Sequence, residues 1–103
     1  MIRIVIADDH ELVRTCFRMI LAREADLDVV GEAATGEEAV ALARRLRPDV
    51  VLMDVQLPGI SGLEATERIN PNSAGQALPT VVRLYQLKEI VKVEEADFAA
   101  IWE

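Results

Sequence analysis

Cysteine and lysine are both scarce in this chain. The 103 residues contain one cysteine, Cys16, so an intrachain disulfide is excluded and a reducing, cytoplasmic location is expected. Lys88 and Lys92 are the only lysines, and 11 basic residues against 18 acidic ones give a net charge of −7. Because no basic stripe is present, direct binding of nucleic acid is not expected.

Long apolar runs are missing as well. No run approaches the ~18 residues that a membrane-spanning helix needs, and the N-terminus lacks the layout of a signal peptide, so no membrane association is predicted. Hydrophobic residues nevertheless make up 51% of the chain and charged residues 28%, a balance typical of a globular protein. The length suits a single domain spanning 1–103.

The apolar residues that are present follow two alternating spacings. Short runs rich in β-branched residues predict buried strands at 2–7, 29–30 and 50–53. Each run is followed by apolar residues at helical spacing, over 12–21, 39–46 and 63–69. Thr35 with Glu38, and Ser61 with Glu64, have the spacing of capping boxes that begin the second and third helices. This alternation predicts an α/β fold with a parallel sheet and right-handed crossovers.

The pattern loosens after residue 69. A loop is expected over 70–75, which is rich in Asn, Pro, Ser and Gly, and a fourth strand over 80–85. From Leu87 onward two interpretations stay open. The segment forms either one long helix, or a brief strand at 90–93 followed by a helix at 94–102, and periodicity does not choose between them.

Carboxylates follow two of the predicted strands at the point where each strand ends. Asp8 and Asp9 follow the first strand, and Asp54 ends the third. Ligands of an open parallel sheet bind at the carboxyl ends of its strands. Three carboxylates gathered there repel one another unless a cation lies among them, and oxygen ligands of this kind suit Mg²⁺. A carboxylate beside such an ion can act as a nucleophile toward phosphorus.

A purely structural interpretation of these carboxylates competes with this one. An Asp-Asp pair after a strand is common as a solvated loop or a helix cap. An aspartate at the end of a buried apolar run is rarer, because its desolvation is costly. Both features at successive strand ends favour a functional site.

Several segments resemble the receiver domain of bacterial response regulators. These are IRIVIADDH at 2–10, VVGEA at 29–33, RPDV at 47–50, VLMDVQLPG at 51–59 and GLEA at 62–65. The resemblance covers 1–69, and the Asp-Asp-His form is similar to the subclass that usually carries a helix-turn-helix DNA-binding domain. It implies a flavodoxin-like, doubly wound parallel sheet.

The resemblance also implies roles for individual residues. Asp54 would accept a phosphoryl group from a sensor histidine kinase. Asp8 and Asp9 would hold Mg²⁺, directly or through water, and the backbone carbonyl of Gln56 would be the third protein ligand. Such a protein is a switch rather than an enzyme.

The segment 70–103 departs from the family pattern. The family's fourth strand ends in Ser or Thr, whereas here it ends in Leu84-Tyr85-Gln86, and Thr80 lies at the wrong end. The family lysine has no clear counterpart, although Lys92 could stand in for it. By comparison with the family the 103 residues are short by roughly a helix, and no DNA-binding output domain is expected within them.

Three explanations of this divergent tail are open. It rebuilds the end of the sheet in shortened form, it is unrelated sequence joined to a truncated receiver, or the truncated core pairs with a second copy as a homodimer.

Two functional hypotheses follow, and a third is weak. The first is the phospho-accepting switch, and the second is a phosphorylation-incompetent module that dimerises or sequesters a kinase. Hydrolysis of a phosphate ester is weak, because the second catalytic Asp of such folds would lie where Gln56 stands.

Other notable side chains are expected to be structural. His10 is predicted to be a surface residue and Cys16 a buried thiol. Tyr85 is expected to be a plain core aromatic, and the alternative is a displaced version of the aromatic switch residue found in receiver domains. Phe98 and Trp102 are expected to pack in the interior. The charged pairs at 37–38 and 44–45 are expected to be solvated.

Overall fold

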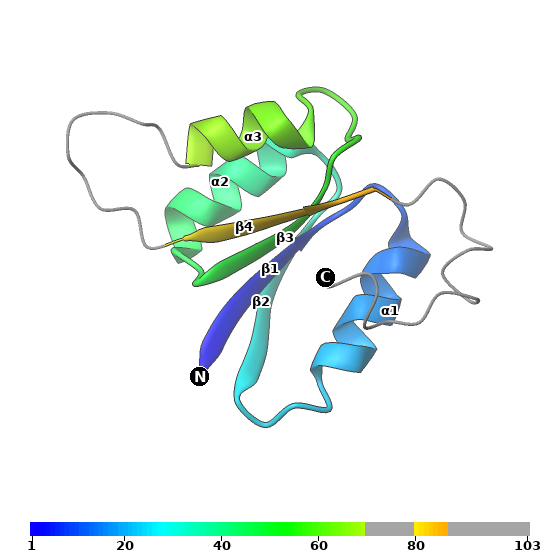
Figure 1. Ribbon diagram of the computed structural model, residues 1–103, viewed down its shortest axis with the longest axis vertical. Helices are drawn as coiled ribbons and strands as arrows, with labels where there is room; N and C mark the ends of the chain where they lie inside the picture. The colour runs from blue at the N-terminus through cyan, green and yellow to red at the C-terminus, as the bar shows by residue number, and fades with distance from the viewer. Residues whose placement is uncertain (70–79, 87–103) are drawn as a thin grey trace.

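The computed structural model describes residues 1–69 and 80–86. Strands and helices alternate along this part of the chain, as the sequence predicted (Figure 1). The elements are β1 (Ile2–Ala7), α1 (Glu11–Leu21), β2 (Leu27–Ala33), α2 (Gly36–Leu46), β3 (Val50–Asp54), α3 (Gly62–Ile69) and β4 (Val81–Tyr85).

The four strands form one parallel sheet in the order β2-β1-β3-β4. Ala7 of β1 is in register with Met53 of β3, and Asp54 of β3 is in register with Tyr85 of β4. The carboxyl ends of these three strands therefore meet at one edge of the sheet. The predicted α/β class, parallel sheet and fourth strand are confirmed.

The second strand is longer than the predicted 29–30. It runs over Leu27–Ala33, and most of its residues are only half-buried because β2 lies at the edge of the sheet. Asp28 and Glu32 alternate with its apolar residues, so the continuous apolar run that marks a central strand is missing.

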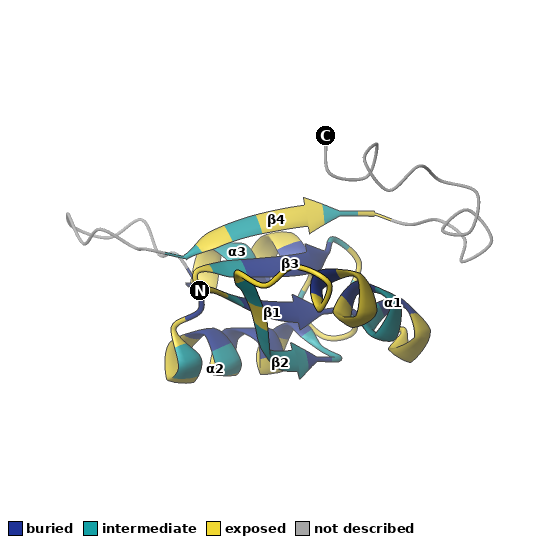
Figure 2. Cartoon of the chain, turned by 90° about the horizontal axis from the view of Figure 1, so that it is seen from below, coloured by how far each residue is buried: buried dark blue, intermediate teal, exposed yellow. Residues whose placement is uncertain are grey.

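Helices cover both faces of the sheet (Figures 1 and 2). Successive side chains of a strand point to opposite faces. Val5 and Ala7 of β1 therefore pack with α2 and α3, in the cluster completed by Ala33, Ala39, Val40, Ala43, Val51, Met53, Ala65 and Ile69. Ile4 and Ile6 pack instead with α1, together with Val13, Phe17, Leu21 and Leu52.

Both predicted helix starts are capped as the sequence indicated. The Glu38 amide donates to Thr35 Oγ1 over 3.1 Å, and the Glu64 amide donates to Ser61 Oγ over 3.1 Å. α2 ends at Arg47, which adopts a left-handed φ of 48° directly before Pro48. Among the described residues, no helix has the length and apolar character needed to cross a bilayer.

Candidate functional site

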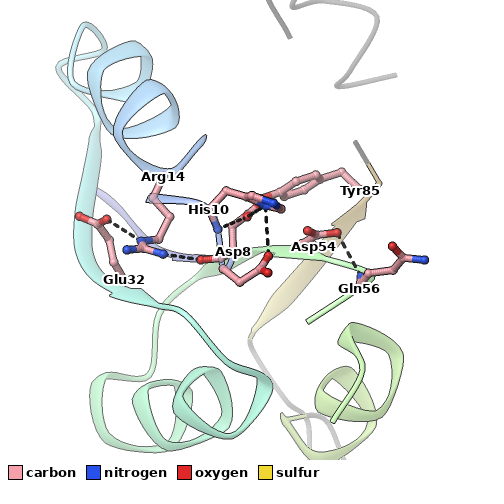
Figure 3. Close-up of polar contacts among 8 residues, drawn as sticks. Asp8, His10, Arg14, Glu32, Asp54, Gln56 and Tyr85 are labelled. Carbon is pink, nitrogen blue, oxygen red and sulfur yellow. Dashed lines mark hydrogen bonds and ion pairs between the residues drawn. The ribbon is translucent and has the colours of Figure 1, made fainter. Parts of the chain in front are cut away.

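The acidic residues lie together at the carboxyl edge of the sheet (Figure 3). Asp8 directly follows β1 and is 1% exposed, and Asp54 is the last residue of β3 and is 5% exposed. Asp9 is exposed. One ligand atom each from Asp8, Asp9, His10 and Asp54 lies within 4.8 Å of the others.

Backbone hydrogen bonds fix the two buried carboxylates. The Asp8 amide donates to the Ala33 carbonyl over 3.0 Å, which extends the β1–β2 pairing into the site. The Val55 amide donates to the Tyr85 carbonyl over 2.8 Å and the Gln56 amide donates to Asp54 Oδ1 over 3.1 Å. Asp54 is therefore held at the point where β3 turns into the following loop.

Glycine is required where α3 begins beside this turn. A Cβ on Gly62 would overlap the carbonyl oxygen of Asp54 and the Cα of Val55. The Gly62 amide also donates to the Val55 carbonyl over 2.8 Å. The close approach of α3 to the end of β3 thus depends on the missing side chain.

Asp8 is surrounded by hydrogen-bond donors. Its Oδ1 accepts from the His10 amide over 2.8 Å and lies 3.0 Å from His10 Nδ1, while its Oδ2 accepts from the Tyr85 hydroxyl over 2.6 Å. Arg14 Nη1 donates to the Asp8 carbonyl over 2.6 Å and is itself oriented by an ion pair between Nε and Glu32. These contacts satisfy a carboxylate that is almost fully removed from water.

Burial and like charge act together on the titration of the site. Burial raises the pKa of Asp54, and the charges of Asp8 and Asp9 raise it further, although the Gln56 amide opposes them. The hydrogen bond to Asp8 raises the pKa of His10, with a smaller contribution from the charge of Asp9. Burial, followed by the hydrogen bond to Asp8, raises the pKa of Tyr85 far above its ordinary value, so the phenol stays protonated.

Three of the structural expectations need correction or extension. Tyr85 packs against the core beside Phe17, as predicted, but its hydroxyl also reaches Asp8, which the prediction did not include. Cys16 is only half-buried, because its helical stripe is partly open to solvent. His10 is on the surface as predicted, with 48% of its side chain exposed, yet its Nδ1 lies within 3.1 Å of both Asp8 and Asp9.

The remaining predicted site residues are placed as follows. Gln56 lies beside Asp54, and its peptide amide contacts that carboxylate. Thr80 lies at the opposite edge of the sheet, where its hydroxyl donates to the Pro48 carbonyl over 2.9 Å. Lys92 lies outside the described residues, as do the predicted loop at 70–75, both interpretations of the segment from Leu87 onward, and Phe98 and Trp102.

Sequence reasoning missed the contact of Tyr85 with Asp8 and the Arg14–Glu32 pair. The contact of Tyr85 follows from the register of β4 against β3, which places that residue opposite Asp54 and is visible only in the structure. Arg14 carries no such signal, because an arginine in the first turns of a helix is ordinarily solvated.

The donor set suits a hard divalent cation. Carboxylate oxygens from two strand ends converge, one of them exposed enough to leave room for water ligands. Mg²⁺ is bound in proteins by one or two carboxylates while it keeps several waters. The residues present therefore fit a magnesium site.

A doubly wound parallel sheet with an acidic cluster at its carboxyl edge defines a class of phosphate- and metal-handling α/β domains. Within that class, the response regulator receiver domain model matches residues 4–98, so the chain belongs to this family. The match extends past the 1–69 on which the resemblance was based.

Two of the relatives that the chain resembles in sequence are also response regulators. The chain is 56% identical over 69 residues to the response regulator GacA of Pseudomonas viridiflava, covering 67% of this chain and 32% of that protein. It is 51% identical over 74 residues to the response regulator UvrY of Escherichia coli K12, covering 72% of this chain and 34% of that one. The chain thus spans about a third of the length of these relatives.

Solved structures give the same fold. The signal receiver domain of the putative response regulator NarL from Mycobacterium tuberculosis superposes with a TM-score of 0.75 at 33% identity, covering 91% of this chain and 73% of that chain. The response regulator domain of Thermotoga maritima CheB superposes with a TM-score of 0.75 at 32% identity, covering 91% and 69%. The flavodoxin-like fold is confirmed.

Proposed function

We propose that this receiver domain accepts a phosphoryl group from a sensor histidine kinase onto Asp54. The observation that carries the proposal is the placement of Asp54, nearly buried at the end of β3 and gathered with Asp8 and Asp9 within 4.8 Å. Its raised pKa reflects the cost of holding an unpaired charge there. A site that disfavours its own ionised carboxylate is suited to a cation and to conversion into an acyl phosphate.

Mg²⁺ is the cation proposed for this site, held by Asp8, Asp9 and Asp54 together with the backbone carbonyl of Gln56. When bound, it screens charge on the phosphoryl oxygens during transfer. Asp8 and Asp9 supply hard oxygen ligands, and the Gln56 amide holds Asp54 Oδ1 so that the other oxygen is free to react.

The proposed transfer exchanges one bond to phosphorus for another. Asp54 Oδ2 attacks the phosphorus of a phosphohistidine on the kinase, the P–O bond forms, and the P–N bond breaks as the imidazole leaves and takes up a proton. Water later attacks the phosphorus, which returns Asp54 as a carboxylate and releases inorganic phosphate. The domain is thus a self-resetting switch rather than an enzyme acting on external substrates.

The remaining features of the proposal follow from composition and family. A net charge of −7 does not favour direct contact with nucleic acid, and a single cysteine agrees with a cytoplasmic location. β4 is the last strand of the described sheet, and its outer edge is where a second copy of the chain would pair. Lys92 remains the candidate for the family lysine.

Phosphorylation by acetyl phosphate with Mg²⁺, read by intact mass, tests the central step. We expect one added phosphoryl group on the wild-type chain and none on Asp54→Asn. Asp28→Asn, which removes an exposed carboxylate from β2, is the matched control and should react as the wild type does.

A folded wild-type chain that binds Mg²⁺ but gains no phosphoryl group would contradict the proposal. It would favour the alternative, a receiver fold that acts by dimerisation or by sequestering a kinase. The identity of Tyr85 supports this alternative, because the family has a small hydroxyl residue at the end of the fourth strand, where this chain has Tyr85.

A further inference from the structure

The phenol of Tyr85 joins two strands that are not neighbours in the sheet. Its hydroxyl donates to Asp8 Oδ2 over 2.6 Å, between residues 77 positions apart in the sequence. β3 lies between the two strands that carry these residues. The side chain therefore reaches across the carboxyl edge of β3, beside Asp54, to contact the residue after β1 (Figure 3).

Two further contacts fix the phenol in this position. Its ring packs against Phe17 of α1, with centroids 5.2 Å apart and planes inclined at 55°. Its backbone carbonyl accepts from the Val55 amide over 2.8 Å. The ring is thus held between α1 and the acidic site, with its hydroxyl inside that site.

The lone pairs of Asp8 are nearly all engaged by protein donors. Each carboxylate oxygen has two lone pairs. His10 approaches Oδ1 with its backbone amide and with Nδ1, and Tyr85 donates to Oδ2. A cation or one of its water ligands would have to share Oδ2 with the hydroxyl of Tyr85, whose hydrogen carries partial positive charge.

We propose that the Tyr85 hydroxyl competes with the divalent cation for Asp8, so that it sets the affinity of the site for Mg²⁺. This proposal rests on the function proposed above for the acidic cluster. Without the cation, the phenol donates to Asp8 Oδ2, the buried carboxylate oxygen that the His10 contacts do not reach. When the cation binds, that hydrogen bond is given up, and part of the binding free energy is spent on displacing it.

A thermodynamic cycle makes the proposal testable. Tyr85→Phe keeps the ring against Phe17 but removes the donor. If the hydrogen bond exists only without the cation, the variant is less stable in EDTA, and it binds Mg²⁺ more tightly by the same factor. The free energy of a hydrogen bond to a charged group corresponds to about a tenfold change in the dissociation constant for Mg²⁺.

The experiment measures the Kd for Mg²⁺ alone, from the backbone amide NMR shifts of the wild type and of Tyr85→Phe. We expect the variant to bind about tenfold more tightly. Thermal unfolding should show a lower Tm for the variant in EDTA and equal Tm values at saturating Mg²⁺. Thr80→Val is the matched control, because it removes a hydroxyl from the residue directly before β4, at the opposite edge of the sheet, where it contacts Pro48. The Kd of this variant should equal that of the wild type.

The outcomes separate this inference from the function on which it rests. An equal or weaker affinity in Tyr85→Phe, with Mg²⁺ binding intact in both proteins, overturns the competition and leaves the proposed function standing. No Mg²⁺ binding by the wild type contradicts the proposed function itself.

A second measurement applies even if the variant does not fold. Tyr85 is the only tyrosine, so the wild type gives a single set of tyrosine ring signals. These signals should shift along the same Mg²⁺ saturation curve as the amide of Asp54. Ring signals that stay constant while the Asp54 amide saturates would also overturn the proposal.

Discussion

The pKa values of Asp54 and His10 are both raised in the acidic cluster, with opposite effects on the charge of the two side chains. Burial, and to a smaller extent the neighbouring carboxylates, raise the pKa of Asp54 and so favour its neutral form, whereas the hydrogen bond to Asp8 raises the pKa of His10 and so favours its charged form. The folded chain therefore reduces negative charge at this edge in two ways when no cation is supplied. Each of these effects can be tested by a single substitution.

Asp54→Asn should stabilise the fold in EDTA at neutral pH by about 1 kcal/mol, the usual scale of a point substitution. Because the folded pKa of Asp54 lies above its ordinary value of 3.8, ionisation costs stability as pH rises through that folded pKa. The gain should be complete above the folded pKa and should vanish below 3.8, where both proteins are neutral at this position. Urea unfolding of the wild type and Asp54→Asn across this pH range measures the gain in unfolding free energy. A less stable Asp54→Asn variant at pH 7 would contradict a cost from the ionised Asp54 carboxylate.

His10→Asn should lower the Tm in mildly acidic buffer and have little effect in alkaline buffer. The folded pKa of His10 is raised above 6.5, so its stabilising contribution is complete below 6.5 and is lost as pH rises through the folded value. Melting curves of the wild type and His10→Asn in EDTA, below pH 6.5 and above the folded pKa of His10, test whether the difference in Tm disappears as the pH rises. An equal difference at every pH would show that the imidazole charge plays no part.

At the scale of elements, the strands were predictable where apolar residues run without interruption. β1 and β3 were found because both faces of each are covered, which requires continuous apolar residues. β2 was found only in part, because an edge strand can alternate polar with apolar residues. Asp8, Asp9 and Asp54 were found because they end predictable strands, whereas Tyr85 required the register between β3 and β4, which no local pattern encodes.

The junction of β3 with α3 gives a prediction at this scale. Gly62→Ala should destabilise the fold by about 2 kcal/mol, since its Cβ would overlap backbone atoms of Asp54 and Val55 that cannot move independently. Gly31→Ala is the control, because its Cβ would meet only the side-chain ends of Leu46, Leu42 and Val5, which can adjust. Chemical denaturation should give a clearly lower free energy of unfolding for Gly62→Ala than for Gly31→Ala. Equal values would show that α3 can shift away from β3.

For the whole molecule, the site exists only when the fold is formed. Its carboxylates come from positions 8, 9 and 54, which the parallel pairing of β1 with β3 brings together. A cation bound there is bound to the folded chain and not to the unfolded one, so it must raise global stability.

Mg²⁺ at about 100 times its Kd should therefore raise the free energy of unfolding by about 2.7 kcal/mol. Asp9→Asn, which removes the exposed carboxylate of the cluster, should abolish most of that increment. Tm values measured with MgCl₂ and with NaCl at matched ionic strength separate specific binding from screening. An identical rise in NaCl would falsify the specific site.

The Asp8–Tyr85 contact is also expected to form late in folding. It joins the residue after the first strand to the last residue of β4, and such a distant pair forms only after the intervening chain has closed a large loop. During synthesis, a chain that has emerged only as far as Asp54 carries all three carboxylates but not the phenol that donates to one of them. The hydroxyl of Tyr85 can therefore reach Asp8 only after β4 has joined the sheet.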